Sequence, residues 1–372
     1  MPKMNYSIII PVFNRPDEVE ELLASLCTQT CHNFDVHIVE DGSDIPCREV
    51  CDRYADRLDI HYYVKENGGP GAARNYGAAH AEGDYLIVLD SDVVVPPGYL
   101  AAISEELQRE PADAFGGPDC AHPDFSPVQK AISYAMTSFF TTGGIRGGSS
   151  SPPGGKRGGA LDKFYPRSFN MGVSRTLWNE LGGFRQMRFG EDIDFSIRIF
   201  KAGARCRLFP EAWVWHKRRT DFHKFFRQVR NSGLARINLH LLHPGSLKLV
   251  HTLPALFTIG CALLAIPFLF GLLLAVLGLI GSTEPGCNMN LVVAMFGASV
   301  MLVALLPLLL YSLLILIDSS VRNRSLWVGI LSVPASFIQL LGYGSGFLSA
   351  AWHRLVLKHK GEGFDGNEQL YK

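Results

Sequence analysis

Two long runs without a charged side chain constrain the fold of this 372-residue sequence more than any other feature. They read PALFTIGCALLAIPFLFGLLLAVLGLI (Pro254 to Ile280) and LVVAMFGASVMLVALLPLLLYSLLILI (Leu291 to Ile317). Each is longer than the roughly 20 residues that a helix needs to cross the hydrocarbon core of a bilayer. One such run could be a buried helix of a soluble protein, but two in tandem predict a membrane domain.

A third apolar run, from Leu326 to Ala351, is interrupted by proline and by three glycines. The interruptions leave open whether this run crosses the bilayer, re-enters it or lies in the interface. Basic residues precede the first run and follow the second, the loop GSTEPGCNMN between them has none, and the tail HRLVLKHK is basic. Because cytosolic loops are enriched in Lys and Arg, this pattern favours a cytosolic C-terminus and an even number of crossings. Three crossings would instead place the basic tail on the side opposite the cytosol, against this rule. Because the third run is ambiguous, the side of the C-terminus stays undecided.

Most of the charge precedes about Arg236, which indicates a separate N-terminal domain. The sequence begins MPKMNYSIII, in which Ser7 to Val12 resemble a strand rather than the apolar centre of a signal peptide. We therefore expect a multi-pass protein of the cell membrane with a cytosolic domain at residues 1–220. A connector at 221–250, a transmembrane region at 251–352 and a basic tail at 353–372 would follow.

The composition excludes some partners and says little about assembly. The formal net charge is zero, from 35 Lys and Arg against 35 Asp and Glu, so no basic field indicates a nucleic-acid partner. The eight cysteines form no disulfide framework, as expected in a reducing compartment. The i,i+4 pairs Cys27/Cys31 and Cys47/Cys51 are better explained as ordinary helical cysteines than as a zinc site. The oligomeric state is not indicated.

Strands and helices alternate in the N-terminal part. The segments SIIIPVF, FDVHIVE, IHYYVKE and DYLIVLD are apolar enough to be buried strands. Between the first two, Val19, Leu22, Leu23 and Leu26 have the i, i+3, i+4, i+7 spacing of a core-facing helix, and AARNYGAAHA predicts another helix before the fourth strand. This alternation predicts an α/β fold with a mostly parallel sheet covered by helices on both faces.

Polar side chains follow three of these strands, at Asn14, Asp41 and the Asp90/Asp92 pair. Carboxyl ends of parallel strands line one crevice, where open α/β sheets bind ligands. The usual phosphate-binding motifs GxGxxG and GxxxxGK[ST] are missing after the first strand, so a diphosphate there needs another source of positive charge. A divalent cation, Mg²⁺ or Mn²⁺, held by Asp92 would supply it. The motif DSD alone could be a polar turn. Its position after a buried strand favours a nucleotide-and-metal site instead.

A second acidic motif, Gly190 to Asp194 (GEDID), begins a helix whose apolar stripe includes Phe195 and Ile199. Acidic residues suit a first helical turn, but three acids in four residues exceed what capping requires. A carboxylate beside a metal-bound diphosphate is a natural general base. Further along, His216 lies in an extended segment, where it is either structural or completes the coordination of the cation.

The ordered motifs together resemble family-2 glycosyltransferases with a GT-A fold. They are IIIPVFNR, VEDGSD, NGGPGAARNYG, DSD, NMGVSR with LGGFR, and FGEDIDFSIRIFKAG, between about Asn5 and Arg218. The resemblance implies a Rossmann-like GT-A domain followed by an all-α transmembrane region. It also implies inverting transfer of a hexose or N-acetylhexosamine from a nucleotide-sugar, with a UDP-sugar favoured. The second strand ends in Glu-Asp where the family often has Asp-Asp, but Asp41 keeps its position.

The resemblance also assigns roles to individual residues. Pro11, Phe13 and Asp41 would hold the base and ribose, Arg74 the nucleotide or its phosphates, and Asp90 the ribose. Asn14 and Ser91, at the same strand ends, complete the expected donor site. Asp92 would ligate Mg²⁺ or Mn²⁺, with His216 as a further ligand. Asp192 would deprotonate the acceptor hydroxyl, and Glu191 would orient donor or acceptor.

The segment that joins this domain to the membrane indicates the acceptor. Asp221 to Leu242 forms a basic amphipathic pattern, typical of a helix that lies on anionic lipid or packs on the catalytic domain. The Gly/Ser/Pro-rich segment from Gly143 to Lys163 is a candidate lid over donor or acceptor phosphate. A QxxRW motif, found in processive synthases of the family, is missing at Gln228 to Ser232, which favours addition of a single sugar.

An enzyme tethered by its own crossings is expected to use a lipid-linked acceptor. A polyprenyl phosphate, a polyprenyl-diphosphate-linked glycan and a glycolipid all fit, and the sequence identifies neither the acceptor nor the sugar. Two alternatives stay open: a polyprenyl-phosphate glycosyltransferase that acts directly on the carrier, and a non-catalytic subunit of a glycan-assembly complex. The complete set of acidic residues argues against the second.

Overall fold

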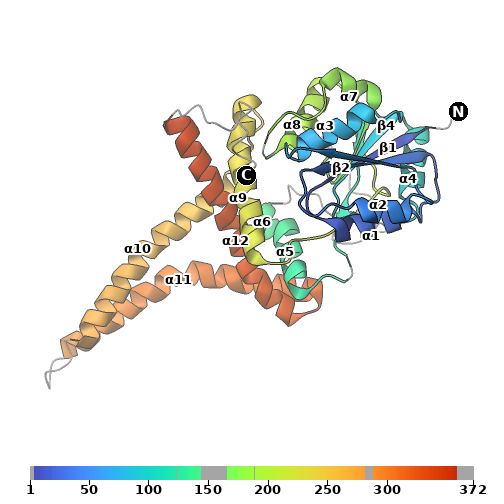
Figure 1. The fold of residues 1–372 in the computed structure, drawn as a ribbon. Coiled ribbons are helices and arrows are strands. Elements are labelled where there is room, and N and C mark those ends of the chain that lie inside the picture. The colour runs from blue at the N-terminus through green and yellow to red at the C-terminus, as the bar shows by residue number, and fades with distance from the viewer. Residues whose placement is uncertain (1–3, 123, 144–165, 188, 281–287, 358–372) are drawn as a thin grey trace.

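The computed structural model describes residues 4–122, 124–143, 166–187, 189–280 and 288–357. It contains a part built around a β-sheet and a part made of long helices, with α9 (Phe222–Leu242) between them (Figure 1). The prediction of an α/β domain followed by an all-α region is confirmed.

The main sheet has seven strands in the order β3-β2-β1-β4-β8-β6-β9. Strands β3, β2, β1 and β4 are parallel, whereas β8 is antiparallel to both neighbours and β9 is parallel to β6. The strands are β1 (Tyr6–Val12), β2 (Phe34–Asp41), β3 (Ile60–Lys65), β4 (Tyr85–Leu89), β6 (Ala114–Gly116), β8 (Asn170–Ser174) and β9 (Cys206–Leu208). A second sheet joins β5 (Val93–Val94), β10 (Val214–His216) and β7 (Asp119–Cys120).

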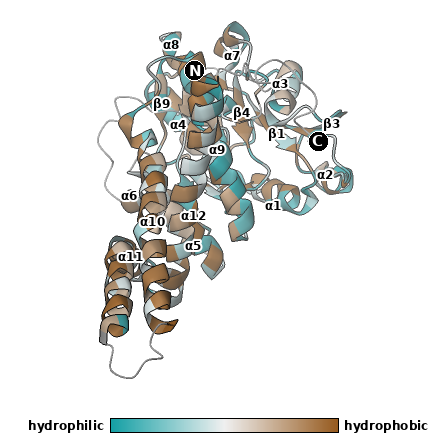
Figure 2. Ribbon diagram, turned by 90° about the vertical axis from the view of Figure 1, so that its left-hand side faces the viewer, coloured by the Kyte–Doolittle hydropathy of each residue, from teal (hydrophilic) through white to brown (hydrophobic). Residues whose placement is uncertain are grey.

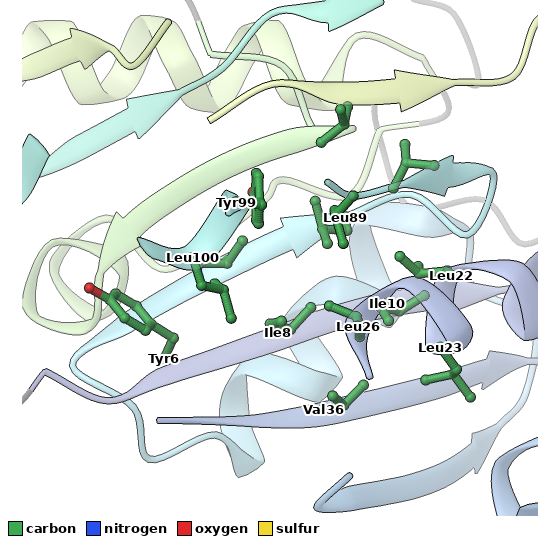
Figure 3. Close-up of a cluster of buried hydrophobic side chains, with 14 of the residues drawn as sticks. Tyr6, Ile8, Ile10, Leu22, Leu23, Leu26, Val36, Leu89, Tyr99 and Leu100 are labelled. Atoms are coloured by element: carbon green, nitrogen blue, oxygen red, sulfur yellow. The ribbon is translucent and has the colours of Figure 1, made fainter. Parts of the chain in front are cut away.

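Helices cover both faces of the main sheet, as predicted. One face packs on α1 (Pro16–Leu26), α2 (Arg48–Tyr54) and α4 (Tyr99–Arg109), and the other on α3 (Pro70–His80), α7 (Arg175–Leu181) and α8 (Glu191–Lys201). Successive side chains of a strand point to opposite faces, so Ile8 and Ile10 enter the first core and Ile9 enters the second. Figure 3 shows the first core, in which Leu22, Leu23 and Leu26 of α1 lie over β1 and β2.

In the described part of the chain, three helices beyond α9 are long and apolar enough to cross a membrane. They are α10 (Leu253–Ile280), α11 (Asn288–Asn323) and α12 (Leu326–Ala351), and η2 (Trp352–Val356) continues the last. The α10–α11 hairpin projects from the rest of the chain and is largely hydrophobic (Figure 2). In an apolar stretch of 18 residues from each helix, 11% of the residues are buried in α10 and in α11, against 39% in the last span. The third candidate, left open by the sequence, is therefore a continuous helix that packs more closely on protein.

Helix α12 meets α9 at very short range. A Cβ added to Gly233 of α9 would lie 2.1 Å from the Tyr343 carbonyl oxygen, and one added to Gly346 of α12 would lie 2.1 Å from the Arg230 carbonyl oxygen. Both distances are shorter than any real contact, so the backbones touch where these glycines lie. The two helices therefore form one joint between the sheet-containing part and the long helices.

The apolar face of α9 is covered by protein. Phe225 and Val229 are buried with side chains of α12 and α5 (Pro127–Thr137), which is followed by the short α6 (Phe139–Thr142). Helix α5, which contributes to this contact, is itself defined at its start by a capping box between Ser126 and Gln129. The sequence left two alternatives for the amphipathic segment, a helix that lies on anionic lipid and a helix that packs on the rest of the protein. For the face that contains Phe225 and Val229, the structure shows the second.

Candidate active site

A single cavity of about 1710 Å³ connects the sheet to the long helices. At one end it is lined by residues that follow β1, β2 and β4, and by the start of α8. From there it continues along α9 and α6 to side chains of α10, α11 and α12. Of the predicted site residues, the cavity lining includes Pro11, Phe13, Asp41, Arg74, Asp90, Ser91, Asp92, Glu191 and Asp192.

Asp41 and Asn14 both hold loops in place. Asp41 Oδ1 accepts hydrogen bonds from Lys65 Nζ at 2.7 Å and from the Gly68 amide at 2.9 Å, and Oδ2 accepts from the Gly69 amide at 2.7 Å. Asn14, with φ of 55°, uses Oδ1 to accept from the amides of residues 44 and 45, and it is not among the residues that line the cavity. Asn14 thus joins the loops after β1 and β2, whereas Asp41 shapes the wall of the cavity.

Arg74 of α3 links the two acidic motifs. Its Nη2 donates to Asp90 Oδ1 at 2.7 Å and its Nη1 donates to Glu191 Oε1 at 3.0 Å. The side chain is only 4% exposed and its guanidinium lies over the Phe184 ring. Since unpaired buried charges are very costly, this bridge fixes the end of β4 relative to α8.

Asp92 lies between two cations. Arg15 Nη1 donates to Asp92 Oδ2 at 2.7 Å, and His216 Nε2 is 3.3 Å from Oδ1. Burial alone would raise the pKa of Asp92, but the charges of His216 and Arg15 hold it well below its usual range. Burial would lower the pKa of His216, but Asp92 and Asp119 raise it to about 9.

The same residues fit a divalent cation. Asp90, Asp92 and His216 each offer one ligand atom, and the three atoms lie within 4.8 Å of one another. His216 turns Nε2 toward Asp92, and its Nδ1 lies 3.8 Å from Asp119 Oδ2 on the other side of the ring. Two carboxylates with an imidazole suit Mn²⁺, and carboxylates alone suit Mg²⁺. The donor set therefore supports the predicted metal type.

Glu191 and Asp192 form the first turn of α8 and are buried in the cavity wall. Arg167 Nε donates to Asp192 Oδ2 at 2.6 Å, and the Ile193 amide donates to Oδ1 at 2.8 Å. Burial alone would raise the pKa of Asp192, but the charge of Arg167 outweighs it and the pKa is lowered. Burial instead raises the pKa of Glu191, against the opposing charge of Arg74. The surroundings thus favour the ionised form of Asp192.

Asp194, the third acid of GEDID, has a different position. It is fully buried and accepts hydrogen bonds from Arg198 Nε and His243 Nε2, both at 2.8 Å. His243 follows α9, so this carboxylate ties α8 to the end of α9. Its place in the motif is structural, and only the other two acids face the cavity.

Two arginines of the site were not predicted. Arg15 is the last residue of the motif IIIPVFNR. Other residues of this motif were predicted to bind the donor, but nothing in the motif indicates that Arg15 pairs with a carboxylate. Arg167 follows the Gly/Ser/Pro-rich segment and belongs to no motif. The predicted lid, Gly143 to Lys163, lies outside the described residues except for Gly143.

Two family models match the sequence. The model described as Glycosyl transferase family 2 matches residues 7–152, and the model described as Glycosyl transferase family group 2 matches residues 85–352. The second match covers more than half of the chain and runs from β4 through α12.

Known relatives match parts of the chain. An uncharacterized glycosyltransferase of Rickettsia felis (strain ATCC VR-1525 / URRWXCal2) is 42% identical over 86 residues, which is 23% of this chain and 14% of that protein. The minor teichoic acid biosynthesis protein GgaB of Bacillus subtilis (strain 168) is 36% identical over 98 residues, which is 25% of this chain and 11% of that protein. The chain thus matches less than a fifth of the length of either relative.

A solved structure has the same fold over most of the chain. The mannosyltransferase PcManGT from Pyrobaculum calidifontis, in complex with GDP-Man and Mn²⁺, matches with a TM-score of 0.53 at 15% sequence identity. The match covers 93% of this chain and 87% of that chain, so it includes helices beyond the sheet. The expectation of a GT-A fold is confirmed.

Proposed function

The chain belongs to the glycosyl transferase family group 2, and from this premise we propose that it transfers a single sugar from a nucleotide-sugar to a lipid-linked acceptor at the membrane. The acceptor would serve cell-surface glycan synthesis, in line with the teichoic acid role in the name of GgaB. The sheet-containing domain would lie on the cytosolic side, where nucleotide-sugars are available.

The observation that carries this proposal is the continuity of the cavity. One end is lined by Asp90, Asp92 and Asp192, and the other by Leu264 of α10, Leu308 of α11 and other side chains of the long helices. An acceptor with a hydrocarbon chain fits such a shape, because its polar head would reach the carboxylates while its chain stays among apolar side chains. A soluble sugar acceptor would leave the apolar end of the cavity in contact with water.

The donor would bind where β1, β2 and β4 end. Pro11, Phe13 and Asp41 would contact the base and ribose, with Asp90 and Ser91 beside them. Asp92 and His216 would hold Mg²⁺ or Mn²⁺, and the bound cation would stabilise the negative charge that develops on the leaving nucleoside diphosphate. PcManGT was solved with GDP-Man and Mn²⁺, which is consistent with this arrangement.

Asp192 would act as the general base. Its ion pair with Arg167 keeps the carboxylate ionised, so it can accept the proton of the acceptor hydroxyl as the sugar bond forms on the opposite side from the leaving group. Glu191, held by Arg74, would orient the donor or the acceptor. A non-catalytic subunit would have no need of this complete set of paired carboxylates.

The test is transfer by purified full-length protein in detergent, with a panel of nucleotide-sugars, a total lipid extract, and Mn²⁺ or EDTA. We expect release of nucleoside diphosphate from one donor, dependent on the metal and coupled to labelling of a lipid. Asp192→Asn should keep nucleotide binding and lose transfer. Asp113→Asn, which changes a half-buried carboxylate paired with Arg205 outside the cavity, is the matched control and should stay active.

Three results would count against the proposal. Transfer to water-soluble glycans alone would refute the lipid acceptor, and full turnover by Asp192→Asn would refute the assigned base. If the product is a sugar on the carrier phosphate itself, the chain is a polyprenyl-phosphate glycosyltransferase instead. Nucleotide binding without turnover on any donor would favour a non-catalytic subunit.

A further inference from the structure

The arginines that line the cavity are of two kinds. Arg15, Arg74 and Arg167, at the end near the sheet, each form an ion pair with a carboxylate. Four others, by contrast, have no carboxylate within 4.0 Å anywhere in the described part of the chain: Arg219, Arg227, Arg230 and Arg236. The first kind balances carboxylates of the site, whereas the second kind has no such partner among the described residues.

The unpaired arginines lie where the cavity passes from polar to apolar walls. Three of them belong to α9, which lies between the sheet-containing part and the α10–α11 hairpin (Figure 1). Beyond α9 the cavity is lined by Leu264 of α10 and Leu308 of α11. A cationic wall followed by an apolar one matches a ligand with an anionic head and a hydrocarbon chain.

Two buried polar atoms support a ligand at this boundary. Nε of Arg236 and Oε1 of Gln339, on α12, have no hydrogen-bond partner among the described residues, although both side chains line the cavity. A buried polar group without a partner destabilises the folded state. This destabilisation would be removed by a head group that accepts from the guanidinium and donates to the amide oxygen directly or through water.

We propose that the acceptor is a glycan carried on a lipid through a phosphate or diphosphate, and that this phosphate binds to the arginines of α9, with the hydrocarbon chain among α10, α11 and α12. This inference rests on the proposed function and narrows the acceptor class. The planar guanidinium presents two parallel N–H groups that match phosphate oxygens. A neutral glycolipid would leave four cations unpaired in the cavity, so the phosphate-bearing carriers are favoured among the acceptors that fit the sequence.

The first experiment compares lipids on the unaltered full-length protein in phosphatidylcholine nanodiscs. The probes are a polyprenyl phosphate, the polyprenol of the same length, and phosphatidylglycerol, each added at the same mole fraction. Binding is measured by capture of the radiolabelled probe. We expect the polyprenyl phosphate to bind about tenfold or more tightly than the polyprenol, since hydrogen bonds to charged groups contribute about 1.5–3 kcal/mol. Equal binding of phosphate and polyprenol would overturn the inference.

Phosphatidylglycerol separates a specific site from general attraction to anionic lipid. If it competes as well as the polyprenyl phosphate, the arginines bind bulk lipid and the inference is wrong. The proposed function fails separately, through absence of sugar transfer in protein that still captures the polyprenyl phosphate. Transfer to a lipid acceptor without phosphate-dependent capture would retain the function and reject this inference.

The second experiment uses variants. Arg230→Gln and Arg236→Gln should each weaken capture of the polyprenyl phosphate about tenfold or more, and raise the KM for the lipid acceptor while nucleotide binding stays unchanged. Lysine at the same positions should restore part of the affinity, because the charge is kept. The matched control is Arg205→Gln, which removes an exposed guanidinium outside the cavity. Unchanged capture in both variants would overturn the assignment of the phosphate to α9.

Discussion

Replacing Arg167 with glutamine should change the pH dependence of transfer in a predictable direction. Arg167 donates to Asp192 at 2.6 Å, and its charge is the main reason that the pKa of this buried carboxylate is lowered. The other charged groups that influence Asp192 are Arg74 and Glu191, which stay in place. Without Arg167, burial dominates and the pKa of Asp192 rises.

The size of the change follows from the contact distance. An opposite charge at this range lowers a carboxylate pKa by about 1–3 units, so its removal should raise the pKa of Asp192 by about the same amount. A general base works only when it is deprotonated, so the acid limb of kcat/KM moves to higher pH by about 1–3 units. Below that limb the rate falls about tenfold per unit, whereas the plateau at higher pH is kept.

The assay is the pH profile of kcat/KM for transfer from the identified donor, measured for the unaltered protein and for Arg167→Gln. Arg205→Gln, which breaks an exposed pair with Asp113, is the control and should keep the original profile. Retained nucleotide binding shows that the variant is folded. An acid limb that does not move would mean that Asp192 is not the group whose ionisation controls transfer, or that Arg167 does not set its pKa.

The remaining predictions concern the metal and the helix joint. Asp92→Asn should lower metal-dependent donor binding at least about tenfold, and equilibrium dialysis with Mn²⁺ should show the same loss of metal affinity. His216→Ala should weaken Mn²⁺ binding by about 10–100-fold if the imidazole is a ligand; an unchanged affinity would make it structural. Gly346→Val should destabilise the protein by about 1–3 kcal/mol or more, because its Cβ would lie 2.1 Å from a carbonyl oxygen. Thermal unfolding in detergent tests this, and Gly260→Ala, where nothing lies within 4 Å of the added Cβ, should leave the midpoint nearly unchanged.

The four parallel strands were predictable because each is a short apolar run followed by turn residues. The direction of β8 (Asn170–Ser174) was not, since a strand pattern gives the two faces of a strand but not the orientation of its partners. β8 pairs antiparallel with β4 and β6, and this pairing brings the chain back across the sheet before the GEDID motif. Local patterns thus predicted the four parallel strands, and the packing decided how the later strands join them.

Helix α5 shows a similar limit. Its side chains Ala131, Ile132 and Met136 are apolar enough for any core, and nothing in the local pattern separates this helix from the N-terminal domain. In the structure they pack with α9 and α12. Whether α5 packs on the sheet or on α9 and α12 depends on the shapes of side chains that are distant in the sequence. A local pattern therefore cannot predict it.

Within the site, the carboxylates were predictable and their partners were not. Asp92 and Asp192 were marked by motifs at a strand end and a helix start. Arg15 and Arg167, which pair with them, come from segments 77 and 25 residues away. Asn14 lies at a strand end, as expected, and the structure adds that its backbone turn and side chain join two loops.

The glycine contacts between α9 and α12 have a consequence for which acceptors the protein can use. The two backbones touch at Gly233 and Gly346, so no side chains lie between α9 and α12 at these points. Because side-chain rearrangement cannot let one helix shift past the other there, the sheet-containing part should move with α12 as one body. Asp194 and His243 join α8 to the same assembly, so the Asp192 carboxylate is held at a constant distance from α12. We therefore expect selection by length. A hydroxyl one sugar nearer to the membrane anchor, or one sugar farther from it, would not reach Asp192. Because each transfer moves the terminal hydroxyl one sugar farther from the anchor, each lipid would be extended only once.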